Sequence, residues 1–423
     1  MDILKTVMDF VLNNVLQDPP VLLGLIAMIG LIVQRKPISE IVKGSVTAAF
    51  GMVILTEGVN MLTGVVSAIN TSVQAKMGIS VAKGLSDATF TADYGGAVGM
   101  AMFLALIIHL IIARFTPVKT IFLTGHMLWW VPFVIVAGGV EGGLRGPVLI
   151  IVSAIMSALY FSVAPWILRK YIWAATGDDS FLIGHPTTIL SLISGFVAKR
   201  VGNKEHSTEN INVPQGLSFF REISISGGLV MFLVDIVVGL IAPALVPKGG
   251  NLFMVALNAG LTFGGGLLIL LYGVRLLVNQ IIPAFQGISE KLVPGAKPAF
   301  DVPILFNYKP NAVIIGFISA FITSTILVLI ANTTNLFGVL VVPMVITCFF
   351  ECGGAAIVGE GQGGVRGAVI GTAVASFAMI ALVGVSAAMM GDTIKNWILI
   401  FGGNDLSLWA IISKLVTSII GGF

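Results

Sequence analysis

The chain has 423 residues, of which 57% are hydrophobic and 10% charged, and its formal net charge at pH 7 is +3. With a mean hydropathy of +1.02, it has too few polar side chains to cover an apolar core in water, which excludes a soluble globular protein. The charge is too small and too dispersed for nucleic-acid binding. The composition therefore predicts an integral membrane protein.

Long apolar segments recur along the chain, separated by polar loops. Windows long enough to cross about 30 Å of hydrocarbon include residues 98–113, 146–165, 225–246, 311–331 and 367–390. We count roughly ten such spans, which predicts an all-α polytopic membrane protein in the lipid bilayer. The N-terminus lacks the cationic region and small-residue cleavage site of a removable signal peptide, so we expect the first span to act as the membrane address.

Basic residues concentrate in alternate loops. They are Arg35, Lys36 and Lys43 after the first span, Arg114 and Lys119 after the third, Arg169 and Lys170 after the fifth, and Lys199, Arg200 and Lys204 in a central loop. Because cytoplasmic loops are rich in Lys and Arg, we expect these loops to be cytoplasmic. The N-terminal segment and residues 70–93, where acidic residues balance or outnumber the basic ones, are predicted to face outward.

One unusual motif occurs twice. Residues 142–148 read Gly-Gly-Leu-Arg-Gly-Pro-Val, and residues 363–369 read Gly-Gly-Val-Arg-Gly-Ala-Val. An aspartate, a polar break and a span precede each copy in the same order, with Asp87 before the first copy and Asp301 before the second. Such duplication is typical of transporters, whose substrate site lies between two repeats. We therefore predict a first half at 1–200, a polar cytoplasmic linker with an amphipathic segment at 201–222, and a second half at 223–423.

Two histidines share a local pattern. Residues 122–126 and 181–185 both read Phe-Leu-x-Gly-His, which places His126 and His185 in apolar segments. An ionisable side chain at a helix centre costs about 2.5 to 3.5 kcal/mol, so each needs a partner or a water-filled cavity. Pro186 disfavours helical geometry at His185, where an imidazole can face a ligand. We predict a substrate role for His185, whereas His126 fits a substrate or a packing role, and His109 is interpreted as structural.

Carboxylates in broken or apolar segments are the other candidates. Asp301 lies between Pro298 and Pro303, a stretch that cannot be a continuous helix and suits a cavity wall. Its carboxylate can accept hydrogen bonds from sugar hydroxyls, or it can pair with Lys297 or Lys309. Because His185 and Asp301 come from different halves, we predict that they lie on opposite walls of one cavity.

The remaining polar groups of the apolar segments have simpler interpretations. Glu57 is a midspan carboxylate with Thr56 nearby, and it is a further candidate for the site. Asp235 and Glu351 are interpreted as structural, Arg145 and Arg366 as anchors of helix ends, and the cysteines at 348 and 352 as buried thiols. We expect neither a metal nor a cofactor.

Several stretches, taken in order, resemble a known family. They are Leu-Thr-Gly-His at 123–126, Ile-Gly-His at 183–185, Phe-Gln-Gly-Ile-Ser at 285–289, Pro-Gly-Ala at 294–296, Asp301, Pro-Asn-Ala-Val at 310–313 and Gly-Gly at 363–364. The chain resembles the membrane-embedded enzyme IIC permeases of the phosphoenolpyruvate-dependent sugar phosphotransferase system (PTS), specifically the ascorbate-type branch. The resemblance covers nearly the whole length.

The resemblance implies a homodimer of about eleven-span subunits in the bacterial cell membrane. Each subunit has two repeat-related halves with broken or re-entrant helices, a core domain that holds the sugar, and a V-motif domain that forms the dimer. An elevator-like movement delivers the sugar to a separate soluble IIB, whose phosphocysteine donates the phosphoryl group that a soluble IIA supplies. The chain contains no IIA or IIB sequence, so we expect it to have no catalytic residue and to be no enzyme by itself.

The resemblance also implies which residues bind the ligand. His185 and Asp301 match positions that contact ascorbate in the family, and His126 matches its Gly-His. The family's Thr-Tyr after the aspartate that aligns with Asp87 is here Ala88-Thr89, and its glutamines are here Trp130 and Pro186. The predicted substrate-binding residues are His185, Asp301, His126, Asp87, Thr89, Trp130, Thr187 and Glu57. Losing these glutamine and tyrosine groups penalises ascorbate itself, so we expect an ascorbate-like or related carbohydrate.

Two functions from other classes remain open at this stage. A proton-driven secondary transporter could use Asp301, Glu57 or the histidines without a phosphorylated partner, because repeats and broken helices also occur in that class. A structural or channel-forming protein is less favoured, because the polar breaks are too localised to line a continuous pore.

Overall fold

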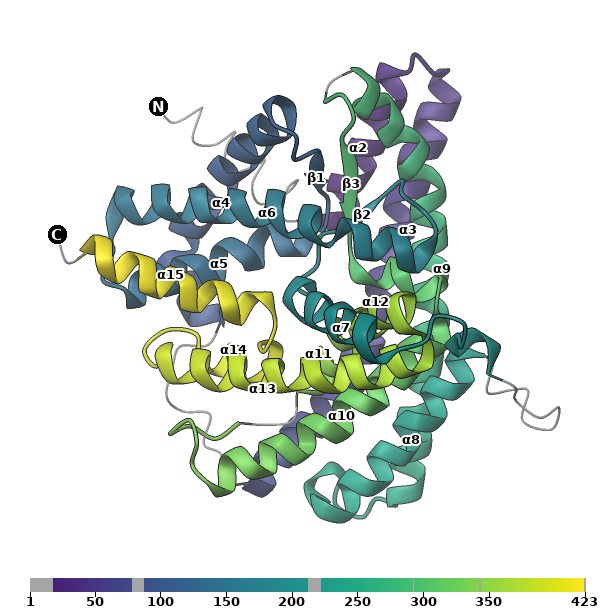
Figure 1. Ribbon diagram of the computed structural model, residues 1–423, viewed down its shortest axis with the longest axis vertical. Helices are drawn as coiled ribbons and strands as arrows, with labels where there is room; N and C mark the ends of the chain where they lie inside the picture. The colour runs from purple at the N-terminus through teal and green to yellow at the C-terminus, as the bar shows by residue number, and fades with distance from the viewer. Residues whose placement is uncertain (1–17, 78–86, 212–221, 292, 342–343, 422–423) are drawn as a thin grey trace.

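The computed structural model describes residues 18–77, 87–211, 222–291, 293–341 and 344–421 (Figure 1). The first part of the chain forms α2 (Pro19–Val33), α3 (Ile38–Met77), α4 (Asp87–Phe115), β1 (Thr120–Phe122), α5 (Gly125–Glu141), α6 (Gly146–Thr176), β2 (Leu182–Ile183), α7 (Thr188–Val201) and the short turn η2 (Thr208–Asn210). The second part forms α8 (Ile223–Ile241), η4 (Pro243–Leu245), α9 (Leu252–Lys291), β3 (Lys297–Phe300), η5 (Val302–Asn307), α10 (Pro310–Thr333), α11 (Val345–Phe349), α12 (Glu351–Arg366), η6 (Gly367–Gly371), α13 (Thr372–Met389), α14 (Lys395–Phe401) and α15 (Asp405–Gly421). The predicted amphipathic segment of the linker and most of the N-terminal segment lie outside the described residues.

Local sequence signals fix several helix ends. Asp18 caps α2 by accepting a hydrogen bond from the Val21 N–H at 3.0 Å, and two prolines follow it in the first turn. Helix α6 ends at Gly177, which adopts a left-handed conformation with φ of 71°. At the other end of α6, Arg145 donates to the carbonyls of Val140 and Leu144, both at 2.7 Å. This confirms Arg145 as an anchor of a helix end.

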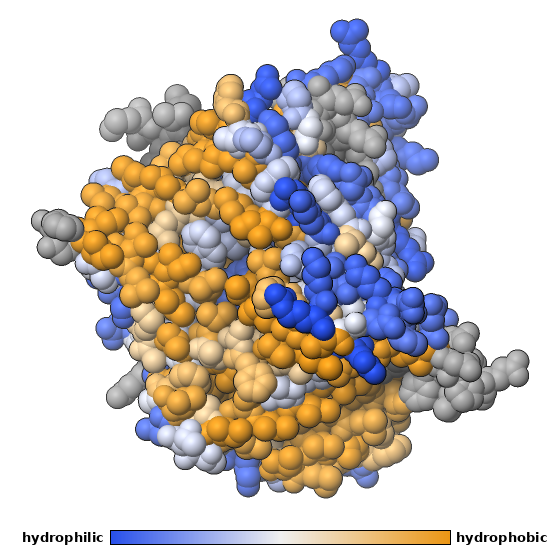
Figure 2. All heavy atoms as spheres, viewed as in Figure 1, coloured by the Kyte–Doolittle hydropathy of each residue, from blue (hydrophilic) through white to orange (hydrophobic). Residues whose placement is uncertain are grey.

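The described residues are mostly helical, and six helices are long and apolar enough to cross a membrane. They span Ile38–Val73, Asp93–Phe115, Gly146–Thr176, Leu252–Leu277, Pro310–Thr333 and Val345–Met389, and the shorter apolar helices Pro20–Val33 and Gly227–Ile241 add to them. Large apolar side chains such as Ile155 on α6 and Leu329 on α10 are exposed on the surface. Figure 2 shows a broad apolar surface on this face, with polar residues gathered toward its upper right. The prediction of an integral membrane protein is confirmed.

Four helices, α2, α3, α8 and α9, pack mainly on one another along the right side of Figure 1. The two longest, α3 and α9, have 40 residues each and make the most extensive contact between any two described elements. Glycine makes this contact close. A side chain at Gly51 would lie 2.6 Å from the backbone nitrogen of Leu277, and one at Gly273 would lie 2.3 Å from that of Leu55. The remaining α-helices of the described structure, α4 to α7 and α10 to α15, form a second group.

Both copies of the glycine-arginine motif lie where one helix gives way to the next. In the first copy, Gly143 and Gly146 have positive φ values of 94° and 60° between α5 and α6. In the second, Gly363 and Gly364 depart from helical geometry at the end of α12, and Gly364 has φ of 60°. Left-handed backbone of this kind favours glycine. The repeated sequence therefore encodes a repeated break.

The expectation of an all-α chain misses one small element. Strands β1, β3 and β2 form a parallel sheet in that order, with Phe122 paired to Ala299 and Ile183 paired to Phe300. Each strand has only two to four residues. Segments this short have too few residues to show the alternation that identifies a strand. Their pairing nevertheless positions the site described below.

Candidate functional site

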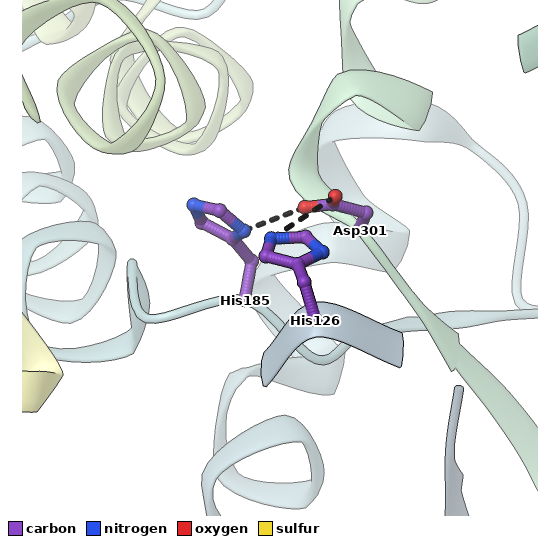
Figure 3. Close-up of side chains that lie close together, drawn as sticks. All are labelled: His126, His185 and Asp301. Carbon is purple, nitrogen blue, oxygen red and sulfur yellow. Dashed lines mark ion pairs between the residues drawn. The ribbon is translucent and has the colours of Figure 1, made fainter. Parts of the chain in front are cut away.

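The small sheet brings together the three residues that follow its strands. Because β1, β2 and β3 are parallel, their carboxyl ends meet at one edge. Asp301 follows β3 directly, His185 lies two residues after β2, and His126 lies in the first turn of α5 after β1. Figure 3 shows the two imidazoles and the carboxylate turned toward one another.

The Phe-Leu-x-Gly-His pattern has a steric basis at its glycine. A side chain at Gly184 would lie 2.9 Å from the ring of Phe122 and 3.1 Å from the carbonyl oxygen of Ala299. The N–H of Gly184 also donates to the carbonyl of Phe300 at 2.7 Å, extending the pairing of β2 with β3. The pattern therefore places an imidazole just beyond a tightly packed strand end.

Asp301 is the centre of the cluster. Its Oδ1 lies 2.6 Å from Nδ1 of His185, and its Oδ2 lies 3.7 Å from Nε2 of His126. The short contact with His185 is an ion pair rather than an aligned hydrogen bond, and Oδ1 also accepts the N–H of Val302 at 2.8 Å. On its other side, Nε2 of His185 lies 3.7 Å from Oε1 of Glu351. An imidazole is thus held between two carboxylates.

Electrostatics favour the charged forms of His185 and Asp301, which lie outside the candidate spanning helices. Burial disfavours the imidazolium, but the neighbouring Asp301 and Glu351 raise the pKa of His185 to about 10. Burial likewise opposes the carboxylate of Asp301, yet His185 and His126 lower its pKa to about 2. The pair is therefore ionised at neutral pH.

A cavity of about 330 Å³ lies beside this cluster. Its polar lining residues are Thr56, His126, His185, Asp301 and Glu351, and its aromatic ones are Trp130, Phe350, Trp397 and Phe401. The rings of Trp130 and Trp397 stack with centroids 5.2 Å apart. Helix α3 supplies Met52, Leu55, Thr56 and Val59. The cavity thus lies between α3 of the first helix group and residues of the second.

Besides the ion-paired Nδ1 of His185, two buried polar atoms of the cavity wall have no hydrogen-bond partner within the described structure. They are Nε2 of His185, which lies 3.7 Å from Glu351, and Oε2 of Glu351, and the two residues are 6% and 5% exposed. Buried polar atoms are otherwise almost always satisfied, because leaving one unpaired costs about 1 to 3 kcal/mol. An apolar cavity with a few convergent polar groups is the usual form of a small-molecule site.

Hydrogen bonds from neighbouring polar side chains fix Glu351 and the backbone that follows His185. Thr187 donates its hydroxyl to the carbonyl of Glu351 at 2.7 Å, and Asn404 donates to Oε1 of Glu351 at 2.6 Å. Asp405 accepts the N–H groups of Thr188 and Ile189 at 3.0 and 2.8 Å, which caps α7 across a long sequence separation. These contacts fix the position of Glu351 and the start of α7, and they leave Oε2 of Glu351 without a hydrogen-bond partner in the described structure.

The same cluster has the composition of a metal site. One ligand atom from each of His126, His185 and Asp301 lies within 4.8 Å of the other two. A divalent ion would have to displace the proton of His185 and widen its 2.6 Å contact with Asp301. The existing ion pair therefore competes with any metal.

The structure places the predicted substrate-binding residues in three groups. His185, Asp301, His126 and Trp130 line the cavity. Thr187 lies behind Glu351, and Glu57 is exposed on α3, where its neighbour Thr56 lines the cavity instead. Asp87 and Thr89 fall in the first turn of α4, and their side chains lie outside the described part of the structure.

The structure contradicts one expectation about Asp301 and one of the two alternatives left open for it. It does not lie on the wall opposite His185, because the two are in direct contact. Nor does it pair with a lysine, since Lys297 pairs with Asp179 at 2.8 Å and Lys309 with Glu360 at 3.0 Å. Parallel strand pairing, which the sequence did not reveal, brings both residues to one edge.

The structural interpretation of His109 is confirmed. Its Nε2 accepts the backbone N–H of Phe122 at 3.0 Å, and its Nδ1 lies 2.8 Å from the hydroxyl of Ser162. Both ring nitrogens are thus satisfied, and the imidazole holds β1 against α6. Cys348 and Cys352 are buried free thiols, as expected.

Sequence reasoning missed Glu351 and Trp397 as cavity residues. Glu351 is a lone carboxylate in an apolar run, which was a usable signal, but it was interpreted as structural. Trp397 lies on the short helix α14 directly after Lys395 and Asn396, and no motif marks it as a site residue. Only packing against Trp130 brings it to the cavity.

Comparison with known proteins identifies the family of the chain and agrees with its membrane setting. The model of a family described as the PTS system sugar-specific permease component, EIIC-GAT, matches residues 14–405. The chain is also 24% identical over 425 residues to the ascorbate-specific PTS system EIIC component of Mycoplasma pneumoniae. That match covers 85% of this chain but 63% of the relative, so the chain spans less than two thirds of the relative's length. The predicted resemblance is confirmed, and because the family model covers most of its length, the chain belongs to the EIIC-GAT family of PTS sugar-specific permease components.

Proposed function

We propose that the chain is the enzyme IIC subunit that moves an ascorbate-like or related carbohydrate across the bacterial cell membrane for phosphorylation by a separate IIB. The observation that carries the proposal is the cavity beside His185, Asp301 and Glu351, with its unpaired buried polar atoms, in a chain of the sugar-specific permease family. The phosphoryl group comes from a phosphocysteine of IIB, which IIA recharges. This chain contributes binding, orientation and exclusion of water.

The two helix groups support an elevator-like movement. The cavity is bounded by α3 of the group that also contains α2, α8 and α9, and by α5, α12 and α14 of the other group. The tight glycine contacts of α3 with α9 favour a rigid V-motif scaffold. We propose that the second group is the core domain and carries the ligand past this scaffold.

The internal duplication supports two related halves, 1–200 and 223–423, joined by the linker at 201–222. Each half contains one 40-residue helix, α3 or α9, and one motif break. The packing is exchanged between them, because α15 packs on α5 while α7 packs on α12. This is the pattern expected of repeats related by a pseudo-two-fold axis. The six long helices and the two shorter apolar helices supply eight of the about eleven spans that we propose for each subunit.

The rival function is a proton-coupled secondary transporter of a small polar solute. A buried imidazole and carboxylate at a cavity are the parts such a transporter uses. However, although burial lowers the pKa of His185, the charges of Asp301 and Glu351 outweigh this effect and raise it to about 10. The pKa of Asp301 is lowered to about 2. The 2.6 Å ion pair thus stabilises the charged forms of both groups, which favours the phosphotransferase function.

Reconstituted vesicles distinguish the two functions. With phosphoenolpyruvate, the general PTS proteins, IIA and IIB on the cytoplasmic side, we expect uptake of labelled sugar and recovery of its phosphate ester. Omitting IIB should abolish accumulation. Accumulation of unmodified sugar driven by a proton gradient alone would establish the rival.

A further inference from the structure

We propose that Asn404 and Asp405, at the start of α15, are positioning residues that hold His185 and Glu351 at the cavity without contacting the ligand. The inference rests on the proposed function, because it concerns the cavity assigned to the carbohydrate. Asn404 and Asp405 are almost fully buried, at 0% and 2% exposure. Neither is among the residues that line the cavity in the described structure.

Asp405 fixes the chain that follows His185. Its Oδ2 accepts the N–H of Thr188 at 3.0 Å, and its Oδ1 accepts that of Ile189 at 2.8 Å. Its own N–H donates to the carbonyl of Pro186 at 3.2 Å. One residue of α15 therefore makes three bonds to the backbone directly after His185.

The carboxylate of Asp405 replaces a local cap of α7. Thr187 occupies the N-cap position, but its side chain caps no helix N–H. Its hydroxyl lies 3.0 Å from that of Ser191 and donates to the carbonyl of Glu351 at 2.7 Å. Because the first N–H groups of a helix need an acceptor, Asp405 supplies from another helix what the sequence around α7 does not.

The imidazole of His185 depends on this backbone for its direction. Its ring nitrogens make no aligned hydrogen bond within the described structure, so charge alone holds the ring between Asp301 and Glu351. Coulomb attraction varies with distance and not with angle. The backbone on both sides must therefore set where the ring lies, through the bond of Gly184 to β3 on one side and through Asp405 on the other.

Asn404 holds the second carboxylate of the cavity in the same way. Its side-chain nitrogen donates to Oε1 of Glu351 at 2.6 Å, and its side-chain oxygen accepts the N–H of Leu406 at 3.0 Å. The first turn of α15 thus orients the amide, and the amide orients Glu351. Hydrogen bonds from such an outer layer hold ligand-binding groups in place.

Nuclear magnetic resonance of ¹⁵N-labelled histidine tests the proposal without any ligand. In Asp405→Asn the amide keeps one accepting oxygen, so at least one of the N–H groups of Thr188 and Ile189 loses its acceptor. We expect the resonances of both ring nitrogens of His185 to change at pH 7. Those of His109 should stay the same, because β1 and α6 hold its ring.

Binding measured by calorimetry at pH 7 gives the consequence for the site, with ascorbate and glucitol as probes. For a probe that the wild-type protein binds, we expect Asp405→Asn to bind about tenfold or more weakly, because displaced polar groups leave hydrogen bonds to the ligand unmade.

Two control variants separate positioning from general destabilisation. Tyr160→Phe removes the hydroxyl that donates to the same Oδ2 of Asp405 at 3.0 Å, and it keeps both bonds to the start of α7. Ser413→Ala removes a buried 2.6 Å bond between α15 and the carbonyl of Ile135 on α5. Both should keep the resonances of His185 and the affinity, with thermal unfolding as the check on folding.

Unchanged His185 resonances in folded Asp405→Asn, or the same change in Ser413→Ala, would overturn the inference. If Asp405→Asn does not fold, Asn404→Ala takes its place. There the resonance of Nε2 of His185, which lies 3.7 Å from Glu351, should change more than that of Nδ1, and unchanged resonances would again overturn the inference. If the wild-type protein binds neither probe, that result counts against the proposed function, whereas the resonances still decide the positioning role.

Discussion

His185 depends on Asp301 for its place and its charge. The imidazole is 7% exposed, and its ion pair with Asp301 at 2.6 Å compensates the cost of burying both charges. Truncating either partner leaves buried polar atoms that bulk water does not reach. We therefore expect the two side chains to act as one unit in ligand binding, so that single substitutions have similar effects.

We expect His185→Ala and Asp301→Asn each to weaken sugar binding about tenfold or more, because an unsatisfied buried group costs roughly 1 to 3 kcal/mol. Equilibrium binding to purified protein measures the loss, with thermal unfolding as a check on folding. Glu57→Gln is the matched control, since Glu57 is exposed on α3 next to the lining residue Thr56. Unchanged affinity in both site variants would show that the ligand binds elsewhere.

The ion pair should also be insensitive to pH over a wide range. The pKa of His185 is raised from 6.5 to about 10, so its contribution to stability is complete below pH 6.5 and is lost as pH rises through 10. The pKa of Asp301 is lowered from 3.8 to about 2, so its contribution is complete above pH 3.8 and is lost as pH falls through 2.

Nuclear magnetic resonance of ¹⁵N-labelled histidine should therefore show His185 as imidazolium from about pH 4 to 9. In Asp301→Asn, burial without that counter-charge should lower the pKa of His185 and bring its titration toward neutral pH. A wild-type His185 that titrates near pH 6.5 would contradict the ion pair.

At the scale of elements, a polar clasp joins the segment before η2 to α10 and α12. Oε2 of Glu360 on α12 pairs with Lys309 at 3.0 Å, and its Oε1 accepts the hydroxyl of Ser207 at 2.6 Å. Backbone bonds reinforce the clasp, because the N–H of Val365 donates to the carbonyl of His206 at 2.7 Å beside the motif break. The segment at 206–207 of the predicted linker is thus fixed to the second copy of the repeated motif.

Glu360→Gln should destabilise this clasp. Removing the carboxylate leaves Lys309 without its counter-charge, and because the Lys309 side chain is 24% exposed, we expect a cost below the about 3 to 5 kcal/mol of a fully buried pair. We expect a clear decrease in unfolding temperature in detergent and faster proteolysis within 203–211. Glu205→Gln, on an exposed residue of the same segment, is the control. Equal stability of both variants would mean that the clasp contributes little.

Features that depend on residues close to one another in the chain could be predicted from the sequence. Long apolar runs identify spans because the bilayer sets their length, and the repeated Gly-Gly-x-Arg-Gly motif identified both breaks. His185 and Asp301 stood out because each is a costly polar group at a proline-broken segment. Their direct contact could not be predicted, because it depends on strands of two to four residues that pair over long sequence separations. Glu351 and Trp397 reach the cavity by tertiary packing alone.

At the scale of the whole molecule, the group of α2, α3, α8 and α9, which we propose as the V-motif domain, offers an apolar face to a partner or to lipid. Val46, Phe50 and Val53 on α3 are all exposed, by 43%, 60% and 45%. Exposed apolar side chains in a membrane protein face either lipid or another subunit, and an elevator needs a scaffold that stays fixed while the core moves. We therefore infer that this face of α3 lies at the interface of a homodimer.

Cysteine cross-linking and particle mass test this inference. In a background without Cys348 and Cys352, both buried, a cysteine at Phe50 should form a disulfide between subunits on mild oxidation. A cysteine at Ile155 on α6, which is 47% exposed, should not, because α6 belongs to the proposed core. Mass measurement in nanodiscs should give twice the 44.4 kDa of one chain. A strictly monomeric particle that still transports would rule out the dimer, and cross-linking at Ile155 instead of Phe50 would move the interface to the core.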